Sequence, residues 1–471
     1  MASTDARPGA LKRFGRLFRD ALSGEEHDFT KGDLRVGVGL LAIPMVLEMS
    51  MESVFGVVDV FFVARLGSDA VAAVGLTEAL LILIYAIGFG LGVPAMSLVA
   101  QRVGERRLDD AAVTAVQVVG IALAIAVVLG VPGLLFAGQL LAMMGGSPEV
   151  VAMGTGYATV MFLSAPSIVL LFTLGSVLRG AGDAAGAMRA LWLANGINIV
   201  LDPCLIFGLG PFPELGLVGA AIATTIGRSA GVLYQLARLR SGARGLVVRG
   251  HHLRVRPDVI RQLMKMSIGG IGQNLVETAS WLLLIRIVSP FGSTVLAGYT
   301  IALRVLVFAM MPAWGMASAA ATLVGQNLGA GHPDRAERAV WLCGWYVTAF
   351  LWAFALGMLV FDHALVALFT SDPDVIAAGA DCIRIIAYGY VLYGWGMVMI
   401  QAFNGSGHTG VPLVLNVVCF WLVKLPLAYA LAVPLGHGPS GVWIAVTLAY
   451  VLSAVLGIVL FRRGGWRVAV G

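Results

Sequence analysis

Three carboxylates share one face of the first long apolar segment of the chain. Glu48, Glu52 and Asp59 are spaced i, i+4 and i+11, so on a helix they fall within about 40° of one another. Ionisable groups at membrane depth cost about 2.5–3.5 kcal/mol each on insertion scales and mark functional sites by default. We therefore expect this face to line a cavity or to meet hydrogen-bond donors.

Two further apolar segments carry polar side chains of the same kind. Asn198 and Asp202 share one helix face at i, i+4, and Glu277 matches Glu52 in the internal repeat described below. Clustered carboxylates hold protons near neutral pH, and together with amide oxygens they also bind hard cations such as Na⁺. An organic cation would compete for the same negative charge, and this competition is a sufficient mechanism for exchanging an ion against a substrate.

Each of these acids also has a purely structural interpretation, which the sequence leaves open. Lys424 stands close to the position that matches Asp202 in the repeat, so it could neutralise an acid. The structural alternatives are hydration at a helix end for Glu48, a cap or a pair with Arg65 for Asp59, a contact with Asn198 or Arg228 for Asp202, and a pair with Arg286 or Lys424 for Glu277.

Aromatic and methionine side chains are frequent between residues 281 and 399. They would suit an apolar pocket for planar cations, although ordinary packing explains most of them. The residues that we assign to a substrate cleft are Glu48, Tyr299, Trp314, Tyr393 and Lys424.

The composition places these residues in a membrane protein. Of 471 residues, 59% are hydrophobic and 12% are charged, against about 45–50% and 25% in soluble domains. The net charge of +5 comes with no dense basic motif, which argues against nucleic-acid binding. The four cysteines are widely spaced, without the spacing of a disulfide framework or a zinc site.

Twelve long apolar segments follow one another along the chain. Segments that span a membrane must be helical, because an open strand would leave backbone groups unpaired in lipid. We therefore expect an all-α polytopic protein with spans near residues 37–62, 74–98, 111–137, 151–177, 187–209, 216–237, 262–288, 295–323, 337–361, 378–402, 411–434 and 440–461.

The connections between these segments alternate in charge. Arginines concentrate after the even-numbered spans, whereas Arg65 alone follows an odd-numbered one. Under the positive-inside rule both termini are cytoplasmic. This predicts a multi-pass protein of the cell inner membrane.

The second half of the chain repeats the first. The segment around Gln101 matches that around Gln326, and Gly180 matches Gly405 at the same offset in residue number. Six helices per repeat give two bundles related by a pseudo-twofold axis along the membrane normal, with a cleft between them. The expected parts are a tail (1–36), an N-lobe (37–238), a linker (239–261), a C-lobe (262–461) and a second tail (462–471).

Several short motifs run through both halves of the chain. They are Ala42-Ile-Pro44, Val57-Val-Asp59, Ala64-Arg-Leu-Gly67, Leu178-Arg-Gly-Ala-Gly-Asp183, Asn198-Ile-Val-Leu-Asp202-Pro, Leu205-Ile-Phe-Gly208, Phe212-Pro-Glu-Leu-Gly216, Gly219-Ala-Ala-Ile-Ala-Thr224 and Val324-Gly-Gln-Asn-Leu-Gly-Ala-Gly331. In combination they resemble the multidrug and toxic compound extrusion (MATE) family. The resemblance implies two six-helix bundles that export organic, often cationic compounds, driven by a proton or sodium gradient.

The resemblance also implies roles for single residues. In the DinF-like branch of the family, an N-lobe cation site corresponds to Asp59, Asn198 and Asp202, which is where Na⁺ would bind here. In the NorM-like branch a C-lobe acid corresponds to Glu277, but the second acid of that branch has no counterpart between residues 388 and 401. We expect ion coupling in the N-lobe, by H⁺ rather than Na⁺, with Glu52 and Glu277 also taking part.

These features together predict a monomeric secondary active multidrug antiporter that works by alternating access, without a cofactor. A flippase for lipid-linked oligosaccharides or other lipids is the alternative, although it would need a cleft rich in arginine. A major-facilitator transporter lacks support, because the loop 101–107 has no Asp-Arg pair. An enzyme is not expected, since the Ser406 and His408 pair has no catalytic partner.

Overall fold

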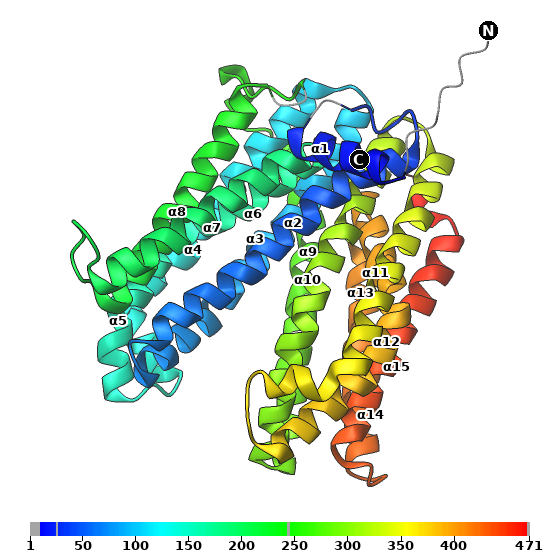
Figure 1. Ribbon diagram of the computed structural model, residues 1–471. Helices are drawn as coiled ribbons and strands as arrows, with labels where there is room; N and C mark the ends of the chain where they lie inside the picture. The colour runs from blue at the N-terminus through cyan, green and yellow to red at the C-terminus, as the bar shows by residue number, and fades with distance from the viewer. Residues whose placement is uncertain (1–9, 25–26, 243–244, 469–471) are drawn as a thin grey trace.

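The structure is a computed structural model that describes residues 10–24, 27–242 and 245–468, and most of them are helical. Two groups of long helices approach each other at the end where α1 (Ala10–Ser23) lies and diverge toward the other end (Figure 1). The described part of the linker lies at the same end as α1, and we call this the linker-side end.

The first group contains seven helices after α1. Their bounds are α2 (Leu34–Ala64), α3 (Ser68–Gly104), α4 (Leu108–Met143), α5 (Pro148–Leu163), α6 (Ala165–Gly180), α7 (Ala184–Phe207) and α8 (Gly216–Arg240). The short 3-10 helix η2 (Gly250–Leu253) follows in the linker.

The second group has the same order of long elements. Their bounds are α9 (Pro257–Val288), α10 (Ser293–Gly329), α11 (Pro333–Ala367), α12 (Pro373–Gly405), α13 (Gly410–Asn416), the π-helix η4 (Val417–Lys424), α14 (Leu425–Ala432) and α15 (Gly438–Arg462). Two 3-10 turns, η3 (Ser289–Phe291) and η5 (Gly465–Arg467), complete it.

The expected all-α architecture is confirmed, and every expected span coincides with one helix or one bent run. Within the described residues, nine helical runs are long and apolar enough to cross a membrane, or ten when α5 and α6, bent by 44°, count as one. One of the nine is the continuous run of α13, η4 and α14. The acid-bearing helices α2 and α9, with 31 and 32 residues, complete the twelve.

The internal repeat is visible in the backbone. Gly67 and Gly292, which match in the repeat, precede α3 and α10 with φ of 106° and 102°. A side chain with a Cβ atom rarely adopts such a conformation, whereas glycine adopts it readily. The two copies therefore use the same turn to start the same helix.

Two hydrophobic cores form, and the first helix of each repeat crosses between them. One core joins α9 to α15 with residues such as Leu41 and Met45 of α2. The other joins α3 to α8 with residues such as Val259 and Leu263 of α9. As a result, α2 packs extensively on α10, and α9 packs extensively on α3. The two lobes are thus held together by an exchange of their first helices.

Hydrogen bonds related by the repeat join the lobes at the linker-side end. Gln101 donates to the carbonyl of Gly405 (3.2 Å), and Gln326 donates to the carbonyl of Gly180 (2.9 Å). Each glutamine reaches from a long helix to the end of a helix in the opposite lobe. We call these two bonds the glutamine clasp.

Glycines allow the two chain segments to approach closely beside the glutamine clasp. A Cβ atom on Gly104 would lie 2.1 Å from the backbone oxygen of Gln326, and one on Gly329 would lie 2.0 Å from that of Gln101. Neither distance is compatible with a side chain, so glycine is required at both positions for this end to close.

Candidate functional site

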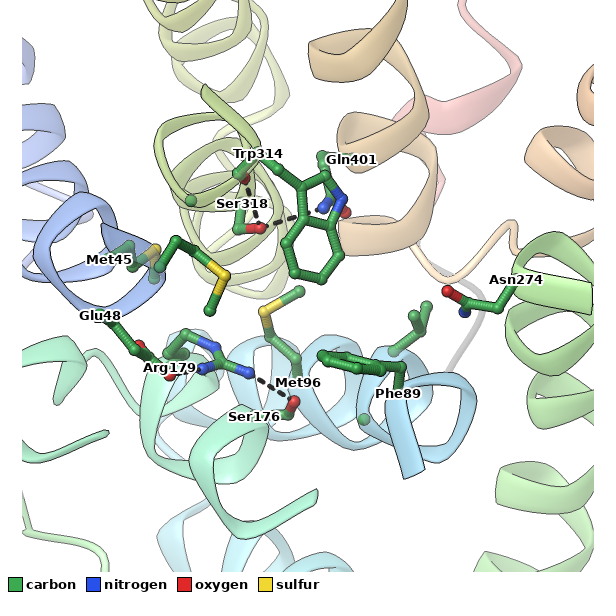
Figure 2. Close-up of a pocket in the computed structure, with 14 residues that line it drawn as sticks. Met45, Glu48, Phe89, Met96, Ser176, Arg179, Asn274, Trp314, Ser318 and Gln401 are labelled. Atoms are coloured by element: carbon green, nitrogen blue, oxygen red, sulfur yellow. Dashed lines mark hydrogen bonds and ion pairs between the residues drawn. The ribbon is translucent and has the colours of Figure 1, made fainter. Parts of the chain in front are cut away.

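A small cavity of about 50 Å³ lies between the lobes (Figure 2). Arg179 lines it and directly precedes Gly180 of the glutamine clasp. Helices from both lobes contribute to its wall. Glu48 and Arg179 lie on one side, and Trp314, Ser318 and Gln401 lie on the other. A second cavity of about 280 Å³ adjoins it and shares Trp314 and Gln401.

Glu48 is paired rather than hydrated. Arg179 Nη1 donates to Glu48 Oε1 at 2.5 Å, and Arg179 Nη2 donates to Ser176 Oγ at 2.8 Å. Both charged side chains are largely buried, and the second oxygen of Glu48 has no hydrogen-bond partner among the described residues. The opposite charges of Glu48 and Arg179 therefore nearly cancel, and the pair lies where the two lobes meet.

The C-lobe has a neutral pair at the matching positions. Gln273 and Asn404 match Glu48 and Arg179 in the repeat, and their side-chain amides exchange hydrogen bonds of 3.1 and 3.2 Å. The repeat thus keeps the position of this contact but not its charge. Of the two contacts, the one in the N-lobe is between ionisable groups.

The larger cavity has the composition expected of a pocket for planar organic molecules. Its wall includes Trp314 and Tyr393, two of the residues that the sequence analysis assigned to a cleft, together with methionines at 310, 311 and 397. Glu277 also lines it. Aromatic faces, polarisable sulfur and one carboxylate would suit an aromatic cation.

The predicted N-lobe site comes together on α2 and α7. Asn198 Nδ2 donates to Asp202 Oδ1 (3.1 Å) and to Thr224 Oγ1 (2.9 Å). The other oxygen of each residue, Asn198 Oδ1 and Asp202 Oδ2, is buried without a hydrogen-bond partner among the described residues. Asp59 is buried and lies close enough to act electrostatically on Asp202. Unpaired amide and carboxylate oxygens are of the kind that accept a proton or bind a hard cation.

Two charged residues that the sequence analysis did not assign to this site also lie near it. Glu78 on α3, which sequence reasoning missed, interacts electrostatically with Asp59 and Arg228. Arg228 was considered only as a structural partner of Asp202, yet it is buried, with Cζ 5.3 Å from the ring centre of Tyr85 and Nη1 unpaired within the described chain. Glu78 lies inside the second apolar segment. Because a charge at membrane depth is costly, this position alone could have marked Glu78 as a candidate functional residue.

Glu52 joins the same group of charges. Its Oε2 accepts a hydrogen bond of 3.0 Å from Asn195 Nδ2, and its charge attracts Arg228. The N-lobe therefore gathers the carboxylates of Glu52, Asp59 and Glu78 around Arg228. Asp202 interacts electrostatically with Asp59.

Two residues assigned to the cleft lie elsewhere, which corrects that expectation. Tyr299 is fully buried in the C-lobe core, where it stacks on Trp443 with ring centres 5.0 Å apart. Lys424 is also buried, with Nζ 4.5 Å from the ring centre of Trp281, and it does not line either interlobe cavity. Hydrophobic packing holds Tyr299 away from the pocket. Lys424 contacts aromatic rings and attracts Glu277 of the cavity wall, a partner that the sequence had named for this acid.

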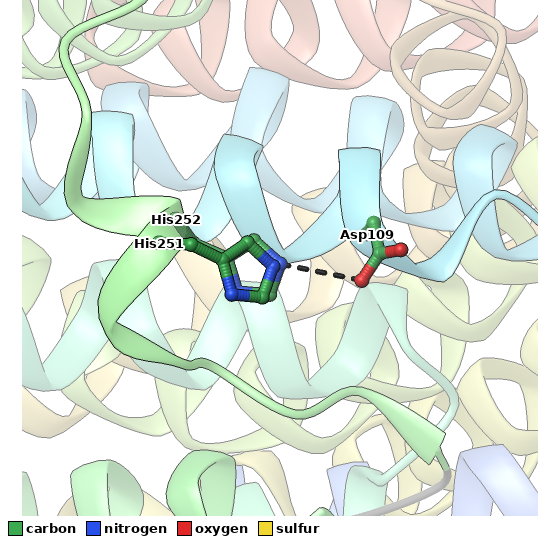
Figure 3. A group of neighbouring side chains, drawn as sticks. All are labelled: Asp109, His251 and His252. Atoms are coloured by element: carbon green, nitrogen blue, oxygen red, sulfur yellow. Dashed lines mark hydrogen bonds and ion pairs between the residues drawn. The ribbon is translucent and has the colours of Figure 1, made fainter.

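Asp109, His251 and His252 are close enough to share a metal ion, since ligand atoms of the three lie within 4.8 Å of one another (Figure 3). However, His252 Nδ1 accepts a hydrogen bond of 3.0 Å from the backbone N–H of Arg249. In the neutral ring Nε2 then carries the proton, and it faces Asp109 Oδ1 at 3.3 Å. This arrangement favours a hydrogen bond that ties the linker to α4 over a metal centre.

A family model described as MatE matches two segments of the chain, residues 44–204 and 271–430. The two segments fall in the first and second repeats. They include the acid-bearing parts of α2, α7 and α9.

Known relatives match over almost the whole chain. A probable multidrug resistance protein of Bacillus subtilis (strain 168), YoeA, is 27% identical over 89% of this chain and 91% of its own length. An FAD transporter of Shewanella oneidensis is 26% identical over 90% of this chain and 96% of its own length. A crystal structure of MATE in complex with MaL6 has a TM-score of 0.87 and 26% identity over 93% of this chain and 97% of that chain.

Proposed function

Because the chain belongs to the MatE family, whose members are transporters and not enzymes, we propose that it is a secondary active multidrug efflux antiporter. It exports organic, often cationic compounds in exchange for H⁺, with Na⁺ as the other candidate ion. The observation that carries this proposal is the pair of unpaired buried oxygens on Asn198 and Asp202 beside Asp59.

The N-lobe site supports the choice of coupling ion. A buried carboxylate oxygen without a donor is costly, so the site gains free energy when a proton or a cation reaches it. The neighbouring carboxylates of Glu52 and Glu78 offer further positions for a proton, and the fixed charge of Arg228 attracts both of them. A proton needs only an unpaired oxygen, whereas Na⁺ needs several oxygens at once, and this difference favours H⁺.

The interlobe cavities support the class of substrate. Their aromatic, methionine and carboxylate walls would hold a planar cation. Within the described residues, the single arginine that lines them, Arg179, is paired with Glu48. This charge pattern does not suit a lipid-linked phosphate, so it argues against the flippase alternative.

The glutamine clasp fits one of two alternating states. In this arrangement the linker-side end is closed by Gln101 and Gln326. This end also carries the arginine-rich connections that predict a cytoplasmic position in the inner membrane. Opening it, while the opposite end closes, would expose the cavity to the cytoplasm and complete the transport cycle.

Proteoliposomes that contain the purified protein test this proposal. Ethidium is loaded inside and its release is followed under a pH gradient and under a sodium gradient, each imposed separately. We expect release under the pH gradient that collapses when a protonophore is added. Release driven by sodium alone would assign the coupling to Na⁺, and no release under either gradient would contradict ion-coupled export.

The FAD transporter among the relatives supplies a second probe. FAD is an anionic aromatic compound, so its transport in the same vesicles measures how far the substrate range extends. Preferential export of FAD over ethidium would contradict the proposed preference for cations.

A further inference from the structure

A cavity of about 690 Å³ opens on the outer side of the N-lobe near the linker-side end. It lies between α4, α6 and α8 and is covered by residues 247–253 of the linker. Its wall is apolar, with Val116, Val119 and Leu174 inside and the exposed Leu236 and Leu253 at its edge. It shares no lining residue with the cavities between the lobes.

The C-lobe fills the equivalent place with its own side chains. Trp341 on α11 matches Val116 in the repeat, and its ring lies 5.9 Å from that of Phe461 on α15. The segment after α15 then places Trp466, which is 1% exposed, flat against Phe461 with ring centres 4.5 Å apart. In the C-lobe, therefore, two tryptophans and a phenylalanine occupy the space between the helices.

The two covering segments are attached at the same point of the repeat. In the C-lobe, Arg467 forms an ion pair with Asp334 in the first turn of α11. In the N-lobe, His252 contacts Asp109, which matches Asp334 and lies in the first turn of α4 (Figure 3). The segments are thus equivalent, but the described part of the linker brings no aromatic side chain into the N-lobe cavity.

Two arginines stand at the edge of this cavity. Arg240 ends α8 and Arg249 precedes η2, and both are exposed. Their neighbours Arg238 and Arg256 pair with Asp183 and Asp258, whereas no ion pair among the described residues involves Arg240 or Arg249. Two uncompensated guanidinium groups beside an apolar cavity match an anionic phosphate linked to a hydrocarbon chain.

The depth of the cavity fits the same ligand. Val116 and Val119 lie in the third and fourth turns of α4, which places them about 12–17 Å along the helix. An acyl chain that starts at the membrane surface reaches this depth, and basic pockets between transmembrane helices bind anionic lipid headgroups.

We propose that this cavity binds an acyl chain of an anionic phospholipid, whose phosphate contacts Arg240 and Arg249. The lipid takes the place that Trp466 has in the C-lobe and stabilises the linker against α4 and α8. This site is independent of the antiport mechanism, because it uses none of the residues of the N-lobe ion site or the interlobe cavities.

Lipid retention by the full-length protein tests the site. The protein is reconstituted with equal amounts of phosphatidylglycerol and phosphatidylcholine and extracted in mild detergent, and the retained lipids are counted by native mass spectrometry. We expect one retained phosphatidylglycerol per protein. The double variant Arg240→Gln/Arg249→Gln should lose the preference for phosphatidylglycerol by about tenfold, which corresponds to about 1.4 kcal/mol.

A cavity-filling variant tests the apolar part separately. Val116→Trp introduces the residue that the C-lobe carries at the matching position, so it should reduce retention of both lipids. If this variant does not yield a monodisperse protein, the arginine double variant decides alone.

The matched control is Arg462→Gln/Arg463→Gln, which removes two charges at the equivalent end of the C-lobe. It should retain phosphatidylglycerol as the wild type does. A wild type without a preference for phosphatidylglycerol would overturn the proposal. An equal loss in the control, or full retention by a folded Val116→Trp protein, would also overturn it.

Discussion

Arg179 donates a hydrogen bond to Glu48 at the point where the second repeat joins Asn404 to Gln273. The two contacts are related by the internal repeat and lie at the same end of the molecule. One is an ion pair and the other is a pair of neutral amides. The neutral pair of the C-lobe therefore serves as an internal comparison for the ion pair of the N-lobe.

The first prediction compares the stability provided by the ion pair with that provided by a neutral pair at the same place. Removing one partner of a buried ion pair leaves an uncompensated charge, which typically costs about 3–5 kcal/mol. We expect Arg179→Asn alone to lower the thermal midpoint clearly, and Glu48→Gln/Arg179→Asn, which recreates the C-lobe pair, to regain most of the loss. Thermal unfolding of both single variants and the double variant in detergent measures the coupling. A single variant as stable as the wild type would show that the pair is solvated.

The second prediction concerns the N-lobe ion site. Asp59→Asn keeps the shape of the side chain but removes its titratable group, so we expect ethidium export to fall to the level of empty vesicles. The protein should still fold, as judged by size-exclusion chromatography. Asp69→Asn, at an exposed position in the first turn of α3, is the control and should export normally. Normal export by Asp59→Asn would count strongly against N-lobe coupling.

The third prediction concerns closure of the linker-side end. Alanine at Gly104 or Gly329 places a methyl group about 2 Å from a backbone oxygen of the opposite lobe. Because backbone cannot yield as a flexible side chain does, we expect either variant to disfavour the closed state by about 1–3 kcal/mol, the range found for overpacking. Export should fall about tenfold, because a change of about 1.4 kcal/mol in the free-energy difference between the open and closed states changes their ratio tenfold.

Two other glycines provide the control for that experiment. Gly120 on α4 and Gly357 on α11 have no atom within 4 Å of the position that a methyl group would take, so alanine there should leave export unchanged. Cross-linking by a bifunctional thiol reagent reports closure directly. Its cysteines are introduced at the exposed Glu105 and His332, next to the ends of α3 and α10 that meet in the closed state. Unaltered cross-linking in the Gly104→Ala protein would mean that the lobes adjust without cost.

The fourth prediction concerns pH and the loop between α12 and α13. Burial lowers the pKa of His408 below its usual value near 6.5, and a backbone hydrogen bond at Ser406 opposes this only in part. The unfolded chain therefore binds the proton more readily, so stability is lost as the pH falls through about 6.5 toward the lower pKa of the folded state. We expect His408→Gln to reduce the fall in thermal midpoint between pH 7.5 and 5.5. An unchanged pH dependence would assign that fall to other groups.

The sequence alone determined the helices, the repeat and the helix faces that carry charge. These properties are local: a segment of about 20 apolar residues must form a helix in lipid, and spacing along it decides which residues share a face. For this reason Glu48, Glu52 and Asp59 could be assigned to one face of α2, whereas Trp314 and Tyr393 were assigned to a cleft by residue type alone. The roles of the acids in ion coupling, and the boundaries of the lobes, remain predictions.

The sequence had already named Asn198 as a contact of Asp202 and Lys424 as a partner of Glu277, but most other contacts between distant segments were decided by the tertiary structure. Tyr299 and Lys424 have the residue types of a binding pocket, but packing against Trp443 and Trp281 buries them elsewhere. Likewise, the partner of Glu48 lies far along the chain, on α6, and α2 and α9 each pack into the core of the opposite lobe. Periodicity states which face of a helix avoids lipid, but the neighbour on that face depends on how distant segments pack, and no local pattern encodes that.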